Sequence, residues 1–157
     1  MVESETSKPF EAAALPDTLL PWTLAVLVMV AASDWLSLWL SRELVPDFMR
    51  EVYATAGFRP LLWFALIVAA PVMEETMFRG FLFKGLLGSW LGETGTILVT
   101  AGAWAGIHFQ YEAYGKVTVF IFGLVLGYAR LRTRSLYTSI YLHGLMNLLA
   151  TLEAAWF

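Results

Sequence analysis

The sequence has no cysteine among its 157 residues. This absence excludes disulfide scaffolds, thiolate zinc sites, cysteine nucleophiles and palmitoyl anchors. Charge is also scarce, since 10 basic and 13 acidic residues leave a formal net charge of −3. A nucleic-acid-binding protein needs a basic surface that displaces counterions from phosphates, so we expect no nucleic-acid partner.

Apolar residues dominate what remains. The chain is 59% hydrophobic, 15% aromatic and 15% charged, whereas an ordinary soluble domain is roughly 45–50% apolar and about 25% charged. A length near 150 residues allows a single domain. Its core could not hide seven Trp, eleven Phe and six Tyr while so few charges covered the outside. The composition therefore predicts a membrane protein.

Five apolar stretches are predicted to cross the membrane as helices. Residues 19–40 supply about the 20 apolar residues that span a hydrocarbon core, interrupted only by Asp34. Residues 61–87 contain Pro71 followed by Glu74, Glu75 and Arg79 before the chain becomes apolar again, and we interpret them as one helix kinked at Pro71. The other three spans are predicted over residues 95–114, 117–128 and 136–152. The predicted fold is all-α, a polytopic membrane helix bundle of about five transmembrane helices.

The charged residues outside these stretches predict the topology. Residues 1–18 form a polar tail that lacks the positive region of a signal peptide, and residues 19–157 form a single transmembrane domain. Arg130, Arg132 and Arg134 lie between the last two predicted spans, and the positive-inside rule places this loop in the cytoplasm. Counting back through the spans places the N-terminus in the cytoplasm as well.

Polar residues within the spans are the candidate functional residues, because ionisable groups in a bilayer are costly. They occur in three clusters, over residues 74–79, 104–108 and 143–147, and the last two contain the only two histidines. Glu75 and Arg79 are four residues apart on a helix and can form an ion pair. Glu74 is rotated about 100° away and lacks this partner. The pair is predicted to be structural and Glu74 to be available for chemistry.

Four of these side chains are predicted to meet at one depth. With about 1.5 Å of rise per residue, Glu74, His108 and His143 lie near the middle of their spans, and Asn147 shares a helix face with His143. A carboxylate and two imidazoles in a low-dielectric cavity can carry out general acid–base hydrolysis. The Asn147 amide can donate to an oxyanion. No serine or cysteine is placed as a nucleophile, so water is the predicted attacking group.

The three clusters resemble the motifs of a known family. Glu74-Glu75-x-x-x-Arg79-Gly80, Trp104-x-x-x-His108 and His143-x-x-x-Asn147 occur in this order, each on a predicted span. They are similar to the motifs of the CPBP family, which includes the CAAX prenyl endopeptidases and the bacterial Abi or bacteriocin-processing proteins. The similar region covers residues 61–150. Trp104 stands where the family usually has Phe, a chemically mild departure.

The resemblance implies an intramembrane endopeptidase of the glutamate type. Glu74 and His108 would activate water, and His143 and Asn147 would stabilise the tetrahedral intermediate. Glu75 and Arg79 would support the first motif. No cofactor is expected, since the His-Glu-x-x-His arrangement of zinc proteases is absent. If zinc were bound, its ligands would be Glu74, His108 and His143.

The sequence is also compatible with two other functions. The chain could be a catalytically silent member that binds a peptide as an immunity factor, or a small transporter or proton-relay subunit. The short length resembles prokaryotic members, so we expect a multi-pass protein of a bacterial or archaeal cell membrane. The expected partners are the lipid bilayer and a membrane-associated peptide or protein, including C-terminal tails. The residues select neither a substrate nor an oligomeric state.

Overall fold

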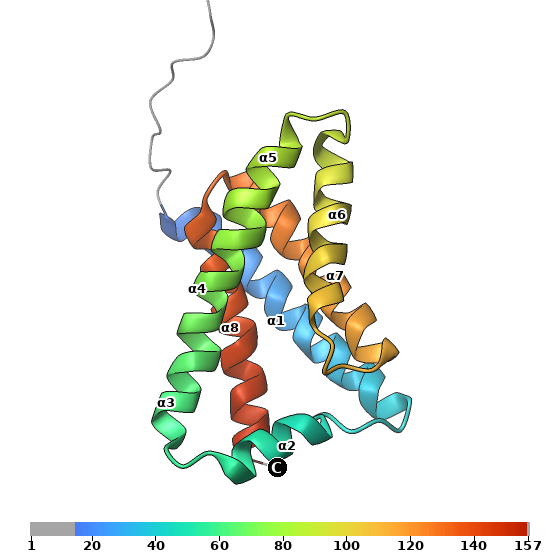
Figure 1. Cartoon of the computed structure of the whole chain (residues 1–157), viewed down its shortest axis with the longest axis vertical. Coiled ribbons are helices and arrows are strands. Elements are labelled where there is room, and N and C mark those ends of the chain that lie inside the picture. The colour runs from blue at the N-terminus through green and yellow to red at the C-terminus, as the bar shows by residue number, and fades with distance from the viewer. Residues whose placement is uncertain (1–14, 157) are drawn as a thin grey trace, which may run out of the picture.

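The computed structural model describes residues 15–156, and this part of the chain contains helices and no strand (Figure 1). The prediction of an all-α bundle is confirmed. The first helix begins at Leu15, four residues before the predicted start. The remainder of the predicted polar tail, residues 1–14, lies outside the described residues.

Four helices are separated from their neighbours by turns: α1 (Leu15–Trp39), α6 (Gly92–Ile107), α7 (Ala113–Thr133) and α8 (Leu136–Trp156). A short helix, α2 (Asp47–Thr55), follows α1. Residues 59–87 then form one continuous helix of five segments: α3 (Arg59–Phe64), η1 (Ala65–Ala69), α4 (Ala70–Glu75), η2 (Thr76–Leu82) and α5 (Phe83–Leu87). In the turn before α6, Gly92 adopts a φ of 59°, which glycine tolerates best.

The continuous helix confirms that residues 61–87 form one element passing through Pro71. The segments η1 and η2 are π-helical, with one residue more per hydrogen-bonded turn. Pro71 lies in the first turn after η1, where its missing N–H disturbs the α-helical pattern. A π-helical segment therefore precedes Pro71, a feature that often marks functional sites, while the kink itself remains a prediction.

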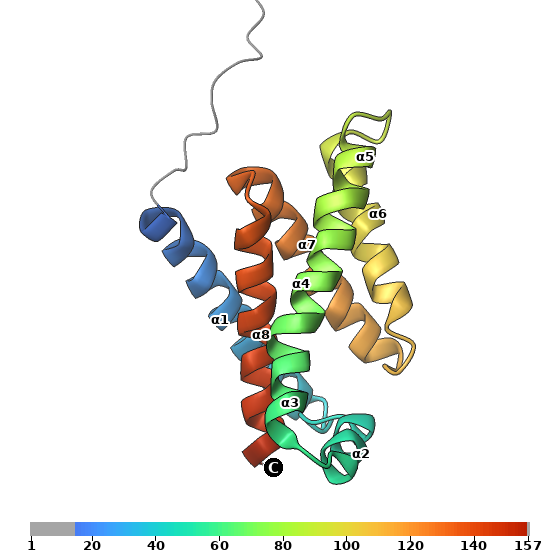
Figure 2. The ribbon, with the colours of Figure 1, turned by 60° about the vertical axis from the view of Figure 1, so that its left-hand side comes forward.

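Helix α8 occupies the middle of the bundle. It packs against α1 and α2, α7, and the η1–α4–η2 part of the long helix, and Figure 2 shows it between α1 and that helix. Helix α6 packs along α7. A Cβ added at Gly123 would lie 3.0 Å from the Ala101 side chain, and one at Gly127 would lie 3.2 Å from Ile97. These two glycines bring α6 and α7 close together.

Three helices are long and apolar enough to span a membrane: Leu19–Trp39, Arg59–Leu87 and Ala113–Thr133. Helix α6 is shorter, with 16 residues, and α8 has 21 residues but carries several polar side chains. The chain is thus a membrane helix bundle, and the full number of five spans remains a prediction.

Several predicted boundaries differ from the observed helix ends, and two of these differences bear on the candidate site and the basic cluster. Helix α6 ends at Ile107 and does not continue to residue 114, because the chain turns at His108, whose carbonyl accepts the Tyr111 N–H. Helix α7 extends beyond Tyr128 and includes Arg130 and Arg132 in its last turn. The basic cluster therefore lies mostly on a helix end, at the same end of the bundle as the start of α1 (Figure 1).

Candidate active site

One half of the candidate site is a buried cluster of charged and polar groups. Glu75 on α4 and Arg79 on η2 have fully buried side chains, and Arg79 Nη1 donates to Glu75 Oε1 over 2.8 Å. The predicted ion pair is confirmed. His143 of α8 lies 3.0 Å from the same carboxylate oxygen through its Nδ1. The motif on the long helix is thus joined directly to the motif on α8.

The surroundings of this cluster compensate in part for burying its charges, since Glu75 Oε2 and Arg79 Nε are buried without a hydrogen-bond partner among the described residues. The other terminal nitrogen of Arg79 donates to the Gly123 carbonyl of α7 over 3.0 Å, and its guanidinium lies 4.8 Å from the centre of the Trp104 ring. Burying an unpaired charge is costly, whereas a paired and hydrogen-bonded one is tolerated. The contacts of Glu75 and Arg79 therefore hold α4, α7 and α8 together, and we assign the pair a structural role.

Glu74 has a different environment, although it is the next residue along α4. Its side chain is only partly buried, and its Oε2 accepts the indole N–H of Trp104 over 2.5 Å. A phenylalanine at this position could not donate this hydrogen bond. The exchange of Phe for Trp was expected to be chemically mild, and this expectation is wrong, because Trp104 provides a donor to the candidate base.

His108 lies at the end of α6 and not in the middle of a span as predicted. It is the C-terminal cap of the helix, and its Nδ1 lies 2.8 Å from the Trp104 carbonyl. A carbonyl can only accept, so Nδ1 carries the proton and Nε2 is left as an acceptor in the neutral ring. This hydrogen bond fixes both the tautomer and the orientation of the imidazole.

Trp104 connects the buried cluster of Glu75, Arg79 and His143 with the second half of the site, which consists of Glu74 and His108. Its ring makes edge-to-face contacts with His108 and His143, with centroid distances of 5.1 and 5.0 Å. The side chain is 2% exposed. Because its N–H contacts Glu74 and its carbonyl contacts His108, one residue orients both groups predicted to activate water.

Asn147 lies one turn beyond His143 on α8. Its Nδ2 donates to the Leu66 carbonyl on η1 over 2.7 Å, so one amide hydrogen is already engaged. The second hydrogen of the same nitrogen is available for another acceptor. The structure thus places Asn147 on the same helix as His143 but bonds it to a different segment of the long helix.

Tyr111 is a neighbour of the site that the sequence did not indicate. It lies in the loop between α6 and α7, with its ring 5.9 Å from His108 and 5.0 Å from Phe48 of α2. A Cβ at Gly115 would lie 2.7 Å from the Tyr111 ring, so this glycine makes room for it. Burial, and secondly the charge of Glu74, raise the pKa of the Tyr111 phenol. The helix predicted through residue 114 obscured this turn, and no pattern in the sequence marks it.

Glu74, His108 and His143, which would be the ligands if zinc were bound, are not gathered into a metal site in this arrangement. Within residues 15–156, no three His, Asp or Glu side chains are grouped closely enough to hold a metal ion.

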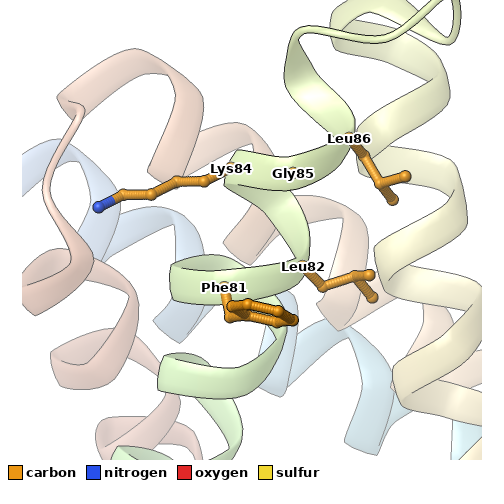
Figure 3. Close-up of a pocket in the computed structure, with 5 residues that line it drawn as sticks. All are labelled: Phe81, Leu82, Lys84, Gly85 and Leu86. Atoms are coloured by element: carbon orange, nitrogen blue, oxygen red, sulfur yellow. The ribbon is translucent and has the colours of Figure 1, made fainter.

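A surface hollow on the long helix lies outside the candidate site. It is lined by Phe81, Leu82, Lys84, Gly85 and Leu86, all from η2 and α5. Figure 3 shows that Lys84 extends away from the side on which Leu82 and Leu86 lie. None of the predicted site residues lines this hollow, so it has no part in the proposed chemistry.

Comparison with known proteins identifies one family. The model of the family described as type II CAAX prenyl endopeptidase Rce1-like matches residues 56–149. This region includes α3 to α6, α7 and most of α8, and it contains all three motifs. No curated protein and no solved structure gives a significant match.

Proposed function

The chain belongs to the Rce1-like family of type II CAAX prenyl endopeptidases, and from this membership we propose that it cleaves a peptide bond with water activated by Glu74 and His108. The family is one of proteases, and the helices place the protein in a membrane. The finer proposal is a glutamate-type mechanism that acts without a metal on a membrane-associated peptide or protein.

The observation that carries this proposal is the arrangement around Trp104. Its indole N–H holds the Glu74 carboxylate, and its carbonyl holds Nδ1 of His108. The described residues give Glu74 no basic partner within salt-bridge distance, whereas Glu75 pairs with Arg79. Glu74 also keeps part of its surface exposed, as a carboxylate that takes a proton from water must. A carboxylate and an imidazole with a bare Nε2, both oriented by one residue, are suited to removing a proton from water.

The reaction then proceeds through a tetrahedral intermediate. Glu74, assisted by His108, takes a proton from water as the water oxygen bonds to the peptide carbon and the carbonyl electrons move to oxygen. The second amide hydrogen of Asn147 donates to this oxyanion. His143 donates from Nε2 when its ring carries both protons, because its Nδ1 is directed at Glu75. The carbonyl re-forms as the C–N bond breaks, and the leaving amine takes the proton that water gave up.

Cleavage of a defined substrate tests the proposal. The purified chain in liposomes should cleave an internally quenched peptide ending in a farnesylated CAAX sequence, and mass spectrometry should locate the cut. Glu74→Gln should reduce the rate by a factor of about 10² to 10⁴, the usual contribution of a general base. Glu93→Gln is the matched control, because Glu93 is an exposed carboxylate at the start of α6. Full activity of Glu74→Gln would contradict the mechanism, and an unprenylated peptide tests whether the lipid is required.

The proposal includes a multi-pass topology in a prokaryotic cell membrane with the N-terminus in the cytoplasm. It is supported by the position of Arg130, Arg132 and Arg134 at the same end of the bundle as the start of α1 (Figure 1). Because the chain has no cysteine, single cysteines can be introduced one at a time. An impermeant maleimide added to intact cells should label Gly57→Cys and not Ser135→Cys. The reverse result would invert the topology.

A further inference from the structure

Each of the two π-helical segments leaves one backbone carbonyl without a partner from its own helix. After η1, the Ala70 N–H donates to the Ala65 carbonyl and not to the Leu66 carbonyl, which it would contact in a regular α-helix. The next residue, Pro71, has no N–H to offer. After η2, the Phe83 N–H donates to the Phe78 carbonyl and not to the Arg79 carbonyl. Buried backbone carbonyls are nearly always paired, so both need another donor.

Side chains from two other helices supply these donors. Asn147 Nδ2 on α8 donates to the Leu66 carbonyl over 2.7 Å. Arg130 Nε on α7 donates to the Arg79 carbonyl over 3.2 Å. The two bonds lie on either side of α4, the segment that carries Glu74 and Glu75. The long helix is thus held from outside at both of its irregular points.

Local packing explains how each side chain reaches its carbonyl. A Cβ at Gly144 would lie 3.0 Å from the Ile67 carbonyl, so the absent side chain lets α8 approach η1 and brings Asn147 within reach. The Arg130 guanidinium is partly buried and lies 5.9 Å from the centre of the Phe83 ring. Arg132, in the same turn of α7, is exposed and provides a natural comparison.

We propose that Asn147 and Arg130 are positioning residues that hold the π-helical segments and thereby fix the direction in which Glu74 and Glu75 project. A change of one residue in helical register rotates every later side chain by about 100°. Relaxation of either segment to regular α-helix would therefore move α4 relative to α6 and α8. As a result, Glu74 would lose its hydrogen bond from Trp104, or Glu75 would lose its contact with His143. The consequence for catalysis rests on the proposed function, but the structural part does not.

The first test requires no substrate and uses the missing N–H of Pro71. Asn147→Ala should lower the thermal unfolding midpoint in detergent, because it leaves the Leu66 carbonyl unpaired. In a Pro71→Ala background, residue 71 gains an N–H that can bond to this carbonyl, so the loss caused by Asn147→Ala should fall by at least half. Pro60→Ala is the matched control, since Pro60 lies at the start of α3 and should leave the loss unchanged. Equal losses in the wild-type and Pro71→Ala backgrounds would overturn the proposal for Asn147.

The second test follows the contact between Trp104 and Glu74 directly. The indole N–H resonance of Trp104, assigned by its loss in Trp104→Phe, should lie downfield because of this hydrogen bond. It should move upfield in Arg130→Met and stay in place in Arg132→Met. If Arg130→Met does not fold, Arg130→Lys takes its place, because it keeps the charge but lacks the Nε donor. An unmoved resonance in a folded Arg130 variant would overturn the proposal for this residue.

Activity adds a readout that separates positioning from general stability. In a folded Arg130 variant, kcat should fall by up to about 100-fold with KM nearly unchanged, as expected when a catalytic group is displaced by about 1 Å. Unchanged kcat would count against positioning. If the chain cleaves no peptide at all, the proposed function fails, while the unfolding and resonance experiments still decide this inference.

Discussion

Glu74 and Glu75 are adjacent carboxylates on the same helix, yet they belong to two different regions. Glu75 is fully buried and shares one oxygen between Arg79 and His143. Glu74 is partly exposed and accepts a hydrogen bond from Trp104. One region is an ionic cluster that joins helices, and the other contains a carboxylate that keeps part of its surface exposed.

The difference arises from helical rotation and not from residue type. Consecutive residues on a helix project about 100° apart, so one carboxylate meets the guanidinium and the other meets the indole. A buried charge needs an opposite charge or hydrogen bonds beside it, whereas a reacting carboxylate must keep part of its surface available. The bundle therefore separates a structural and a chemical carboxylate within a single peptide step.

The largest effect should come from breaking the buried region. Arg79→Met leaves the Glu75 carboxylate buried without its cation, and such a change typically costs about 3–5 kcal/mol of unfolding free energy. Chemical unfolding in detergent measures this loss, with Arg132→Met as the exposed control. Adding Glu75→Gln to Arg79→Met should recover part of the stability. A loss below about 1 kcal/mol would show that the pair is not the structural element described here.

A smaller effect should come from removing the Trp104 N–H, which joins the two regions through its hydrogen bond to Glu74. Trp104→Phe keeps an aromatic ring beside Arg79 but removes the donor to Glu74. A hydrogen bond to a charged group contributes about 1.5–3 kcal/mol, so kcat/KM should fall by at least about tenfold. Trp90→Phe is the control, because Trp90 is 93% exposed. An unchanged rate in Trp104→Phe would mean that Glu74 needs no help from the indole.

Glu74→Gln should have little effect on folding even though it removes a charge. The amide oxygen can still accept the Trp104 N–H, so the unfolding free energy should change by no more than about 1 kcal/mol. Glu75→Gln should destabilise far more, because it leaves the Arg79 guanidinium buried without its anion. Comparable losses in the two variants, measured by thermal unfolding, would erase the distinction between the two regions.

The smallest effect concerns Tyr111 and appears only in alkali. Burial and then the Glu74 charge raise the pKa of Tyr111, so the folded state binds the phenol proton more tightly than the unfolded state. At a pH below the ordinary tyrosine pKa of about 10, the phenol is protonated in both states and the raised pKa does not change the unfolding free energy. As the pH rises from about 10 through the pKa of the folded state, the unfolding free energy falls. The unfolding free energy of Tyr111→Phe should therefore fall less than that of the wild type when the pH is raised from neutral to above about 10. Parallel stability curves for the variant and the wild type would contradict this.

The sequence predicted the features that depend on local spacing. The helical class follows from apolar stretches and their length, and the Glu75–Arg79 pair follows from a separation of four residues. The pairing of Glu74 with Trp104 joins residues 30 positions apart, and only the packing of α6 against the long helix creates it. Nor does the sequence predict the end of α6, because no proline or glycine stands directly at His108 and the turn depends on contacts such as that of Tyr111 with Phe48. The roles assigned to the four catalytic candidates remain predictions.

The length of α6 has a consequence for the turn that follows it. Its 16 residues extend about 24 Å, less than the roughly 30 Å of a typical hydrocarbon core. In Figures 1 and 2 the loop after α6 stops short of the end of the bundle where α2 lies. Irregular backbone at membrane depth is tolerated where it is covered by protein or lines a water-filled cavity. If α6 is one of the membrane spans, its end at His108 lies within the hydrocarbon layer, and the turn there must be covered by protein or must face a water-filled cavity.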